Sequence, residues 1–165
     1  MMASSDVIEV LSLLDDAGLT AWVDGGWGVD ALLGQATREH ADLDLVVPGP
    51  QLAAVRLVLT QAGYTSVLRD LLPASIALAD GQGHEVDLHP VTPTLDGGGD
   101  QALEGGGSFH YPPPVQGSVD GRPVGCVDAQ TQVCCHLGYP PSEKDRQDVR
   151  RLHRRLGVEL PAALR

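Results

Sequence analysis

Residues 22–47, WVDGGWGVDALLGQATREHADLDLVV, alternate short apolar runs with glycine breaks and decide the fold. The run at 20–24 predicts a short strand that the diglycine at 25–26 ends, and 27–33 predicts a short helix closed by a further glycine. After a polar loop, 43–47 predicts a second strand, stopped by a proline. A strand, a diglycine, a helix and a strand in so few residues indicate a mixed α/β chain.

Two aspartates on the second strand are the first sign of chemistry. Residues two apart on a strand point to the same face, so Asp42 and Asp44 present two carboxylates together while Leu43 and Leu45 enter the core. Two like charges on one strand repel each other, so fold stability does not require such a pair. A hard divalent cation, by contrast, requires several carboxylate oxygens close together. An Asp-x-Asp pair also arises by chance on a solvated sheet face, so other residues must support this interpretation.

A later strand repeats the pattern. Residues 84–89 predict a strand on which Glu85, Asp87 and His89 share one face. If the two strands are neighbours, Asp87 converges with the earlier aspartates on one or two Mg²⁺ ions, which can bridge phosphate oxygens. The diglycine before a helix adds N–H groups that can bind a phosphate, although a tight turn would use the same residues.

The rest of the chain predicts a small mixed sheet flanked by helices. Further helices are expected at 6–17, 50–62, 129–137 and 143–156, and further strands at 65–69 and 75–79. Residues 97–125 hold 9 glycines and 4 prolines, and predict a long loop that could cover a cleft. The fold class is therefore α/β (α+β), as a single domain over 1–165 with a helical C-terminal part at about 128–157.

Composition limits the classes of function. The 165 residues are 42% apolar, enough for one buried core, and no apolar run is long enough to span a membrane. The N-terminus lacks the pattern of a secretory signal. The 3 cysteines are an odd number and two are adjacent, which favours helix packing and a reducing cytoplasm over a disulfide framework or a metal site.

Charge is distributed unevenly. Residues 1–142 hold 4 basic and 18 acidic residues, whereas 143–165 hold 7 basic and 4 acidic ones, and the whole chain carries −11. An acidic body favours divalent metals and cationic small molecules as partners. The arginines at 150–155 are typical of a solvated helix end, so we expect no nucleic acid as substrate.

Several of these stretches resemble a known family. The run at 22–47, together with Val86-Asp87-Leu88-His89-Pro90, is similar to antibiotic nucleotidyltransferases of the DNA polymerase β-like superfamily. It is especially similar to small lincosamide nucleotidyltransferases and also resembles aminoglycoside 2″-nucleotidyltransferases. Weaker similarity lies at 121–124, 136–139 and 144–149, so that roughly half of the chain is covered. The segment at 97–114 departs from the family.

The resemblance implies roles for the carboxylates and the diglycine. Asp42 and Asp44 would hold the Mg²⁺ ions that carry a nucleoside triphosphate, and Asp87 would complete the metal site and act as general base on the acceptor hydroxyl. Gly25 and Gly26 would bind the phosphates.

Other residues have two interpretations each. Arg38, assisted by His40, would pair with a triphosphate oxygen, or form a loop salt bridge with Glu39 or Asp42. Asp30 would contact the nucleotide or hold the loop.

Three more residues would lie on the acceptor side. Asp24 would face the acceptor, or cap the following turn. At the position of His89 the aminoglycoside relatives have an acidic residue. This chain has a histidine there, as the lincosamide relatives do. Tyr139 would line the acceptor pocket, or only pack with a wet hydroxyl.

The resemblance implies a magnesium-dependent enzyme, with two ions, that transfers AMP from ATP to a hydroxyl of a small antibiotic and releases pyrophosphate. A lincosamide is the leading acceptor, and an aminoglycoside or a protein side chain is an alternative. An inactive nucleotide-binding module is a further alternative, which the intact trio Asp42, Asp44 and Asp87 disfavours. Small relatives can dimerise and a short chain leaves the acceptor side open, which favours a homodimer.

Overall fold

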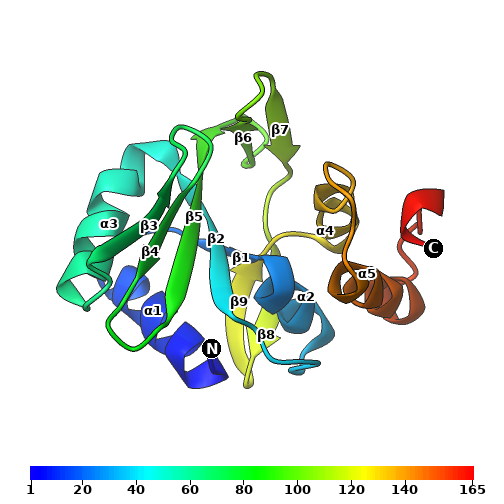
Figure 1. Ribbon diagram of the computed structural model, residues 1–165, viewed down its shortest axis with the longest axis horizontal. Coiled ribbons are helices and arrows are strands. Elements are labelled where there is room, and N and C mark those ends of the chain that lie inside the picture. The colour runs from blue at the N-terminus through cyan, green and yellow to red at the C-terminus, as the bar shows by residue number, and fades with distance from the viewer.

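The computed structural model describes residues 1–165 and contains one mixed sheet with helices packed on it (Figure 1). The strands are β1 (Trp22–Asp24), β2 (Asp42–Pro48), β3 (Ser66–Asp70), β4 (Ile76–Ala79), β5 (Glu85–Pro93), β6 (Gly99–Ala102), β7 (Ser108–Tyr111), β8 (Val115–Val119) and β9 (Arg122–Cys126). The helices are α1 (Ser4–Asp16), α2 (Gly25–Leu33), α3 (Leu52–Gln61), α4 (Ala129–Cys135) and α5 (Glu143–Leu156), with 3-10 turns η1 (Gly49–Gln51) and η2 (Ala162–Leu164). None of the helices combines the length and the apolar character that crossing a membrane requires.

The sheet order places the two aspartate-bearing strands side by side. The strands follow the order β3-β4-β5-β2-β1-β9-β8, and the β6–β7 hairpin extends from β5. β2 runs parallel to β5 and antiparallel to β1, so the sheet is mixed as the sequence predicts. In Figure 1 the β6–β7 hairpin stands above the sheet, and α4 and α5 lie on the side away from α1 and α3.

One face of the sheet forms the main core. Leu43 and Leu45 of β2 and Leu88 of β5 are fully buried there, together with apolar side chains of α1, α2 and α3. Burying such side chains contributes roughly 1.5–3 kcal/mol each, which holds β2 and β5 in register. The alternate residues of both strands are consequently directed to the other face.

The C-terminal helices are fixed to α2 by a second apolar cluster. Val29 of α2 packs with Val133 of α4 and with Val149 and Leu152 of α5. Asp128 caps α4 by accepting hydrogen bonds from the backbone N–H groups of the first turn. This packing brings α4 and α5 beside the beginning of α2.

Two expectations from the sequence are wrong. Residues 97–125 do not form a long loop: they hold β6, β7, β8 and β9, because the glycines and prolines are divided among the turns, the connection between the two hairpins and the strands themselves. The diglycine does not separate strand from helix either. α2 begins at Gly25 itself, directly after β1.

Candidate active site

A row of carboxylates crosses the sheet. Asp24 of β1 stands opposite Asp44 of β2 in the antiparallel register, and Asp44 stands opposite Asp87 of β5 in the parallel register. Asp42 pairs with Glu85 one row further toward the start of both strands. Because alternate residues share a face, all of these carboxylates lie opposite the main core. The expectation that these strands are neighbours is confirmed.

Three side chains place possible metal-ligating atoms close together. One ligand atom each of Asp44, Asp87 and His89 lies within 4.8 Å of the other two. His89 Nε2 is 3.2 Å from Asp44 Oδ1. Asp42 is outside this group, although it lines, with Asp44 and His89, the cavity described below. The structure therefore brings together two of the three expected metal ligands and adds a histidine.

The electrostatics of the row favour a bound cation. Burial raises the pKa of Asp24, Asp42 and Asp87, and the negative charge of Asp44 raises each further. Burial disfavours the imidazolium of His89, but the hydrogen bond and charge of Asp44 outweigh it and raise the pKa of His89 to about 9. One carboxylate oxygen each of Asp24 and Asp87 is buried without a hydrogen-bond partner. A hard divalent cation fits this oxygen-rich donor set.

Besides His89, Arg69 is the basic side chain of the sheet that contacts this row. Its Nη2 lies 3.2 Å from Asp87 Oδ2 and also bonds Glu85. Arg69 belongs to the edge strand β3, and its side chain is 48% exposed. The guanidinium therefore engages one oxygen of Asp87 from the solvent side, while the other oxygen has no partner.

The diglycine leaves room for functional side chains. A Cβ on Gly25 would lie 2.1 Å from Asp44 Oδ2, and the φ of Gly25 is +58°. A Cβ on Gly26 would lie 2.2 Å from His40 Nδ1 and 2.8 Å from Arg38 Nη2. Glycine is thus required at both positions so that the carboxylate and the guanidinium can approach the first turn of α2.

Asp30 and His40 lie beneath the surface of the site. Each is 2% exposed, and His40 Nε2 lies 2.6 Å from Asp30 Oδ2. Asp30 also accepts hydrogen bonds from the hydroxyl and the backbone N–H of Thr37. Of the two interpretations of Asp30, the geometry matches the one in which it holds the loop that carries Arg38.

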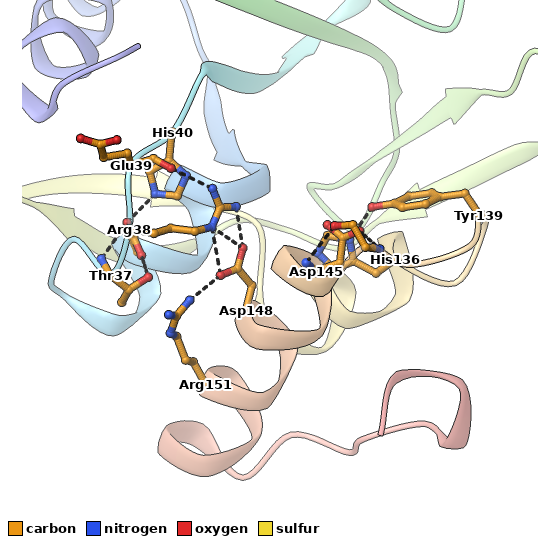
Figure 2. Close-up of polar contacts among 11 residues, drawn as sticks. Thr37, Arg38, Glu39, His40, His136, Tyr139, Asp145, Asp148 and Arg151 are labelled. Carbon is orange, nitrogen blue, oxygen red and sulfur yellow. Dashed lines mark hydrogen bonds and ion pairs between the residues drawn. The ribbon is translucent and has the colours of Figure 1, made fainter.

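Arg38 is held by the C-terminal helix. Its Nη2 donates to Asp148 Oδ2 at 2.6 Å and its Nε at 3.1 Å, while Arg151 Nη1 donates to the other oxygen of Asp148 at 2.8 Å (Figure 2). Asp148 is 2% exposed. The salt-bridge partner of Arg38 is therefore Asp148 rather than Glu39 or Asp42, since the packing of α5 on α2 brings the buried acid closer.

A hydrogen-bonded chain links the β6–β7 hairpin to the acid row. The Tyr111 hydroxyl lies 3.3 Å from Asp24 Oδ2 and 3.2 Å from Gln101 Oε1. The Gln101 amide nitrogen donates to the carbonyl of Ala74 at 2.8 Å and lies 3.2 Å from His89 Nδ1, to which it can donate only when the imidazole is neutral. The side chain of Asp24 lines the cavity and makes no capping bond to α2, so its capping interpretation is not met and its place beside the acceptor stays a prediction.

These side chains surround a cavity of about 400 Å³. Its lining residues are Asp24, Gly25, Gly26, Arg38, Asp42, Asp44, His89, Gln101, Tyr111, Gln132, Cys135, His136, Tyr139, Asp145 and Asp148. The helical wall comes from α2, α4 and α5 and the segments beside them, and the strand wall comes from β1, β2, β5, β6 and β7. Tyr139 lies on the helical wall, where its hydroxyl is 2.6 Å from His136 Nδ1 (Figure 2).

Sequence reasoning missed about half of this lining. Gln101 and Tyr111 lie in the segment expected to be a loop, and Gln132 and Cys135 lie on a helix that was expected only to pack. Asp145 and Asp148 carried a weak signal, since they fall in the stretch at 144–149 that resembles the family.

Comparison with known proteins identifies the family. A family model for aminoglycoside-2″-adenylyltransferases matches residues 6–152. The chain belongs to this family. It is therefore an enzyme of the antibiotic nucleotidyltransferase class, which is the class that the sequence resembles.

Individual family members cover the chain to different extents. A lincosamide resistance protein of Staphylococcus haemolyticus is 28% identical over 92% of this chain and 94% of its own length. The 2″-aminoglycoside nucleotidyltransferase of Escherichia coli is 36% identical, but only over 33% of this chain and 31% of its own. The lincomycin-bound crystal structure of the lincosamide adenylyltransferase LnuA superimposes with a TM-score of 0.81, 28% identity and coverage of 92% and 96%.

The aminoglycoside enzymes share the fold. The crystal structure of ANT(2″)-Ia in complex with adenylyl-2″-tobramycin has a TM-score of 0.73 at 23% identity, covering 93% of this chain and 89% of that one. The α/β nucleotidyltransferase fold expected from the sequence is confirmed.

Replacing Gly25 by alanine should disrupt the site. The new Cβ would overlap Asp44, and alanine is strained at positive φ, so we expect a loss of about 2 kcal/mol or more in the free energy of unfolding. Urea unfolding measures this loss. Gly18→Ala is the control, because Gly18 has a φ of +69° but nothing within 4 Å of its Cβ position, and it should lose only the smaller strain energy. Equal losses would show that contact with Asp44 is unimportant.

Stability without metal should depend on the charge of His89. Its folded pKa is raised from 6.5 to about 9, so the imidazolium stabilises the fold fully below pH 6.5, and this contribution disappears as the pH rises to about 9. We expect the difference in unfolding free energy between wild type and His89→Gln, measured by urea unfolding in chelator, to shrink across that interval. A difference independent of pH would contradict the interaction with Asp44.

Proposed function

We propose that this protein uses Mg²⁺ to transfer AMP from ATP to a hydroxyl group of a lincosamide antibiotic. The observation that carries the proposal is the row Asp24–Asp44–Asp87 beside the diglycine start of α2, with His89 among the possible ligands. Similarity to a lincosamide resistance protein over nearly the full chain supports the acceptor class.

Asp44 and Asp87 would hold the metal, with His89 beside them and Asp42 as a further carboxylate on the same face. A bound metal would supply Lewis-acid chemistry, which would offset the charge of the phosphates and make the acceptor hydroxyl more acidic. We propose two ions, the number that two-metal sites for phosphoryl transfer hold.

The chain's own groups then complete the reaction. Asp87 accepts the proton of the acceptor hydroxyl, for which its Oδ1, buried without a hydrogen-bond partner, is available. The hydroxyl oxygen forms a bond to the α-phosphorus, and the bond from that phosphorus to the pyrophosphate oxygen breaks. The N–H groups of Gly25 and Gly26 and the guanidinium of Arg38 orient the phosphates, while Asp148 fixes the guanidinium.

His89 and the strand wall would receive the acceptor. Gln101 and Tyr111 connect this wall to Asp24, so that His89, Asp24 and Tyr139 are the residues we assign to acceptor binding. An aminoglycoside is a second candidate acceptor, because the cavity is lined by carboxylates that would attract ammonium groups. The chemistry needs ATP, and all three cysteines are free, which supports a cytoplasmic setting.

The decisive experiment incubates the protein with Mg²⁺, ATP and a panel of lincosamides and aminoglycosides, and detects AMP-bearing products by mass spectrometry. We expect an AMP adduct on lincosamides. Adducts confined to aminoglycosides would move the acceptor to the second candidate, and no adduct on any antibiotic would overturn the proposal.

Replacing Asp87 by asparagine should abolish transfer without unfolding the protein. The amide cannot accept the hydroxyl proton and binds a cation poorly, so we expect the turnover rate to fall by at least about a hundredfold. Pyrophosphate release measures this rate. Glu85→Gln is the matched control, because Glu85 lies on the same strand and face and also contacts Arg69. Near-normal turnover of Asp87→Asn would reject the role of Asp87 as base.

A further inference from the structure

The helical wall of the cavity contains a polar side chain that nothing in the protein satisfies. Gln132 of α4 is 0% exposed, and neither its amide nitrogen nor its amide oxygen has a hydrogen-bond partner. One helical turn later, His136 Nε2 is also buried without a partner. Both residues line the cavity. Residues four apart share a helix face, so a donor, an acceptor and an imidazole nitrogen are presented side by side.

The fold itself does not explain Gln132. Burying an amide without partners destabilises a protein, whereas an apolar side chain of similar size would not. The neighbouring Val133 is the residue through which α4 packs on α2 and α5. Buried amides are nearly always hydrogen-bonded, so an unpaired one in a cavity indicates a ligand that completes it.

The position of the amide indicates which ligand. A Cβ on Gly28 would lie 2.3 Å from Gln132 Nε2, so the amide lies against α2 just after the diglycine. His136 is held by Tyr139 on one ring nitrogen, which leaves Nε2 for another partner. Arg38 belongs to the same wall, through its contact with α5. The residues assigned to the acceptor, by contrast, come mainly from the strands.

We propose that Gln132, supported by His136, binds the nucleoside part of the nucleotide and is a specificity residue for it. This inference rests on the proposed function, since it concerns the same cavity. A carboxamide donates and accepts at once, which matches a ribose hydroxyl or the adenine edge that offers one donor beside one acceptor. Gln132 Nε2 lies against Gly28, two residues after the diglycine that we assign to the phosphates, and this position favours the nucleotide over the antibiotic.

Gln132→Leu separates a ligand-binding role from a structural one. We expect calorimetric titration with Mg²⁺ and a non-hydrolysable ATP analogue to show about tenfold weaker binding, because the lost bonds are to the nucleotide. The urea midpoint of the ligand-free variant should be equal to or higher than that of wild type, because an unsatisfied amide is removed. Gln130→Leu, on the exposed side of the same helix, should keep the wild-type affinity.

Further nucleotide analogues identify which part of the nucleotide Gln132 binds. If Gln132 binds a ribose hydroxyl, a 2′-deoxy or 3′-deoxy analogue should bind wild type and Gln132→Leu alike. If it binds adenine, the preference for the ATP analogue over the GTP analogue should be lost in the variant. Unchanged affinity for the ATP analogue, or a lowered urea midpoint with unchanged affinity, would overturn the inference.

The outcomes for the two proposals differ. If wild type binds the analogue but transfers AMP to no antibiotic, the proposed function is wrong. The titration of Gln132→Leu then still decides whether Gln132 binds the nucleotide. If wild type does not bind the analogue at all, both are overturned. If Gln132→Leu raises the KM for the antibiotic and leaves that for ATP unchanged, Gln132 belongs to the acceptor side and the inference is wrong.

Discussion

The register of three strands places negatively charged side chains next to one another, and the arrangement of the site follows from the repulsion between them. β1, β2 and β5 place Asp24, Asp44 and Asp87 in one row, and burial denies them the hydration that would make this tolerable. The apolar side chains on the opposite face hold the register, so the carboxylates cannot move apart without exposing the core. Protein cations compensate only in part, through His89 and the half-exposed Arg69.

The side of the cavity that we assign to the phosphates depends on a long-range contact. Arg38 lies in the loop before β2, but its guanidinium is fixed by Asp148, which is 110 residues away in α5. The bond is buried on the carboxylate side and two arginines share the same acid, so the loop and the helix position each other. Asp30 and His40 fix the other side of that loop. Loss of α5 would therefore release the phosphate side of the cavity even though the acid row would remain.

The sequence predicted what depends on periodicity and glycine, and missed what depends on packing. Alternation placed Asp42, Asp44 and Asp87 on the correct face because side-chain direction on a strand is local. The β6–β7 hairpin was missed because its glycines and the prolines that follow it are typical of loops, and the pairing of β6 with β5 and β7 makes its flanks strands. The partner of Arg38 could not be found locally, since it depends on how α5 packs on α2. Gln132 gave no signal, because a glutamine on a short helix normally faces solvent.

The unsatisfied groups of the cavity and of the neighbouring acid row have one physical explanation. Asp24, Asp87, Gln132 and His136 each keep a buried polar atom without a partner, and every one of them reduces the stability of the ligand-free protein. A protein selected only for stability would replace Gln132 by leucine and separate the aspartates. Retaining these groups makes sense if the cation and the nucleotide complete their hydrogen bonds and charges when they bind. The same groups then stabilise the bound state more than the free one, and this difference is the source of affinity and of orientation for the reaction.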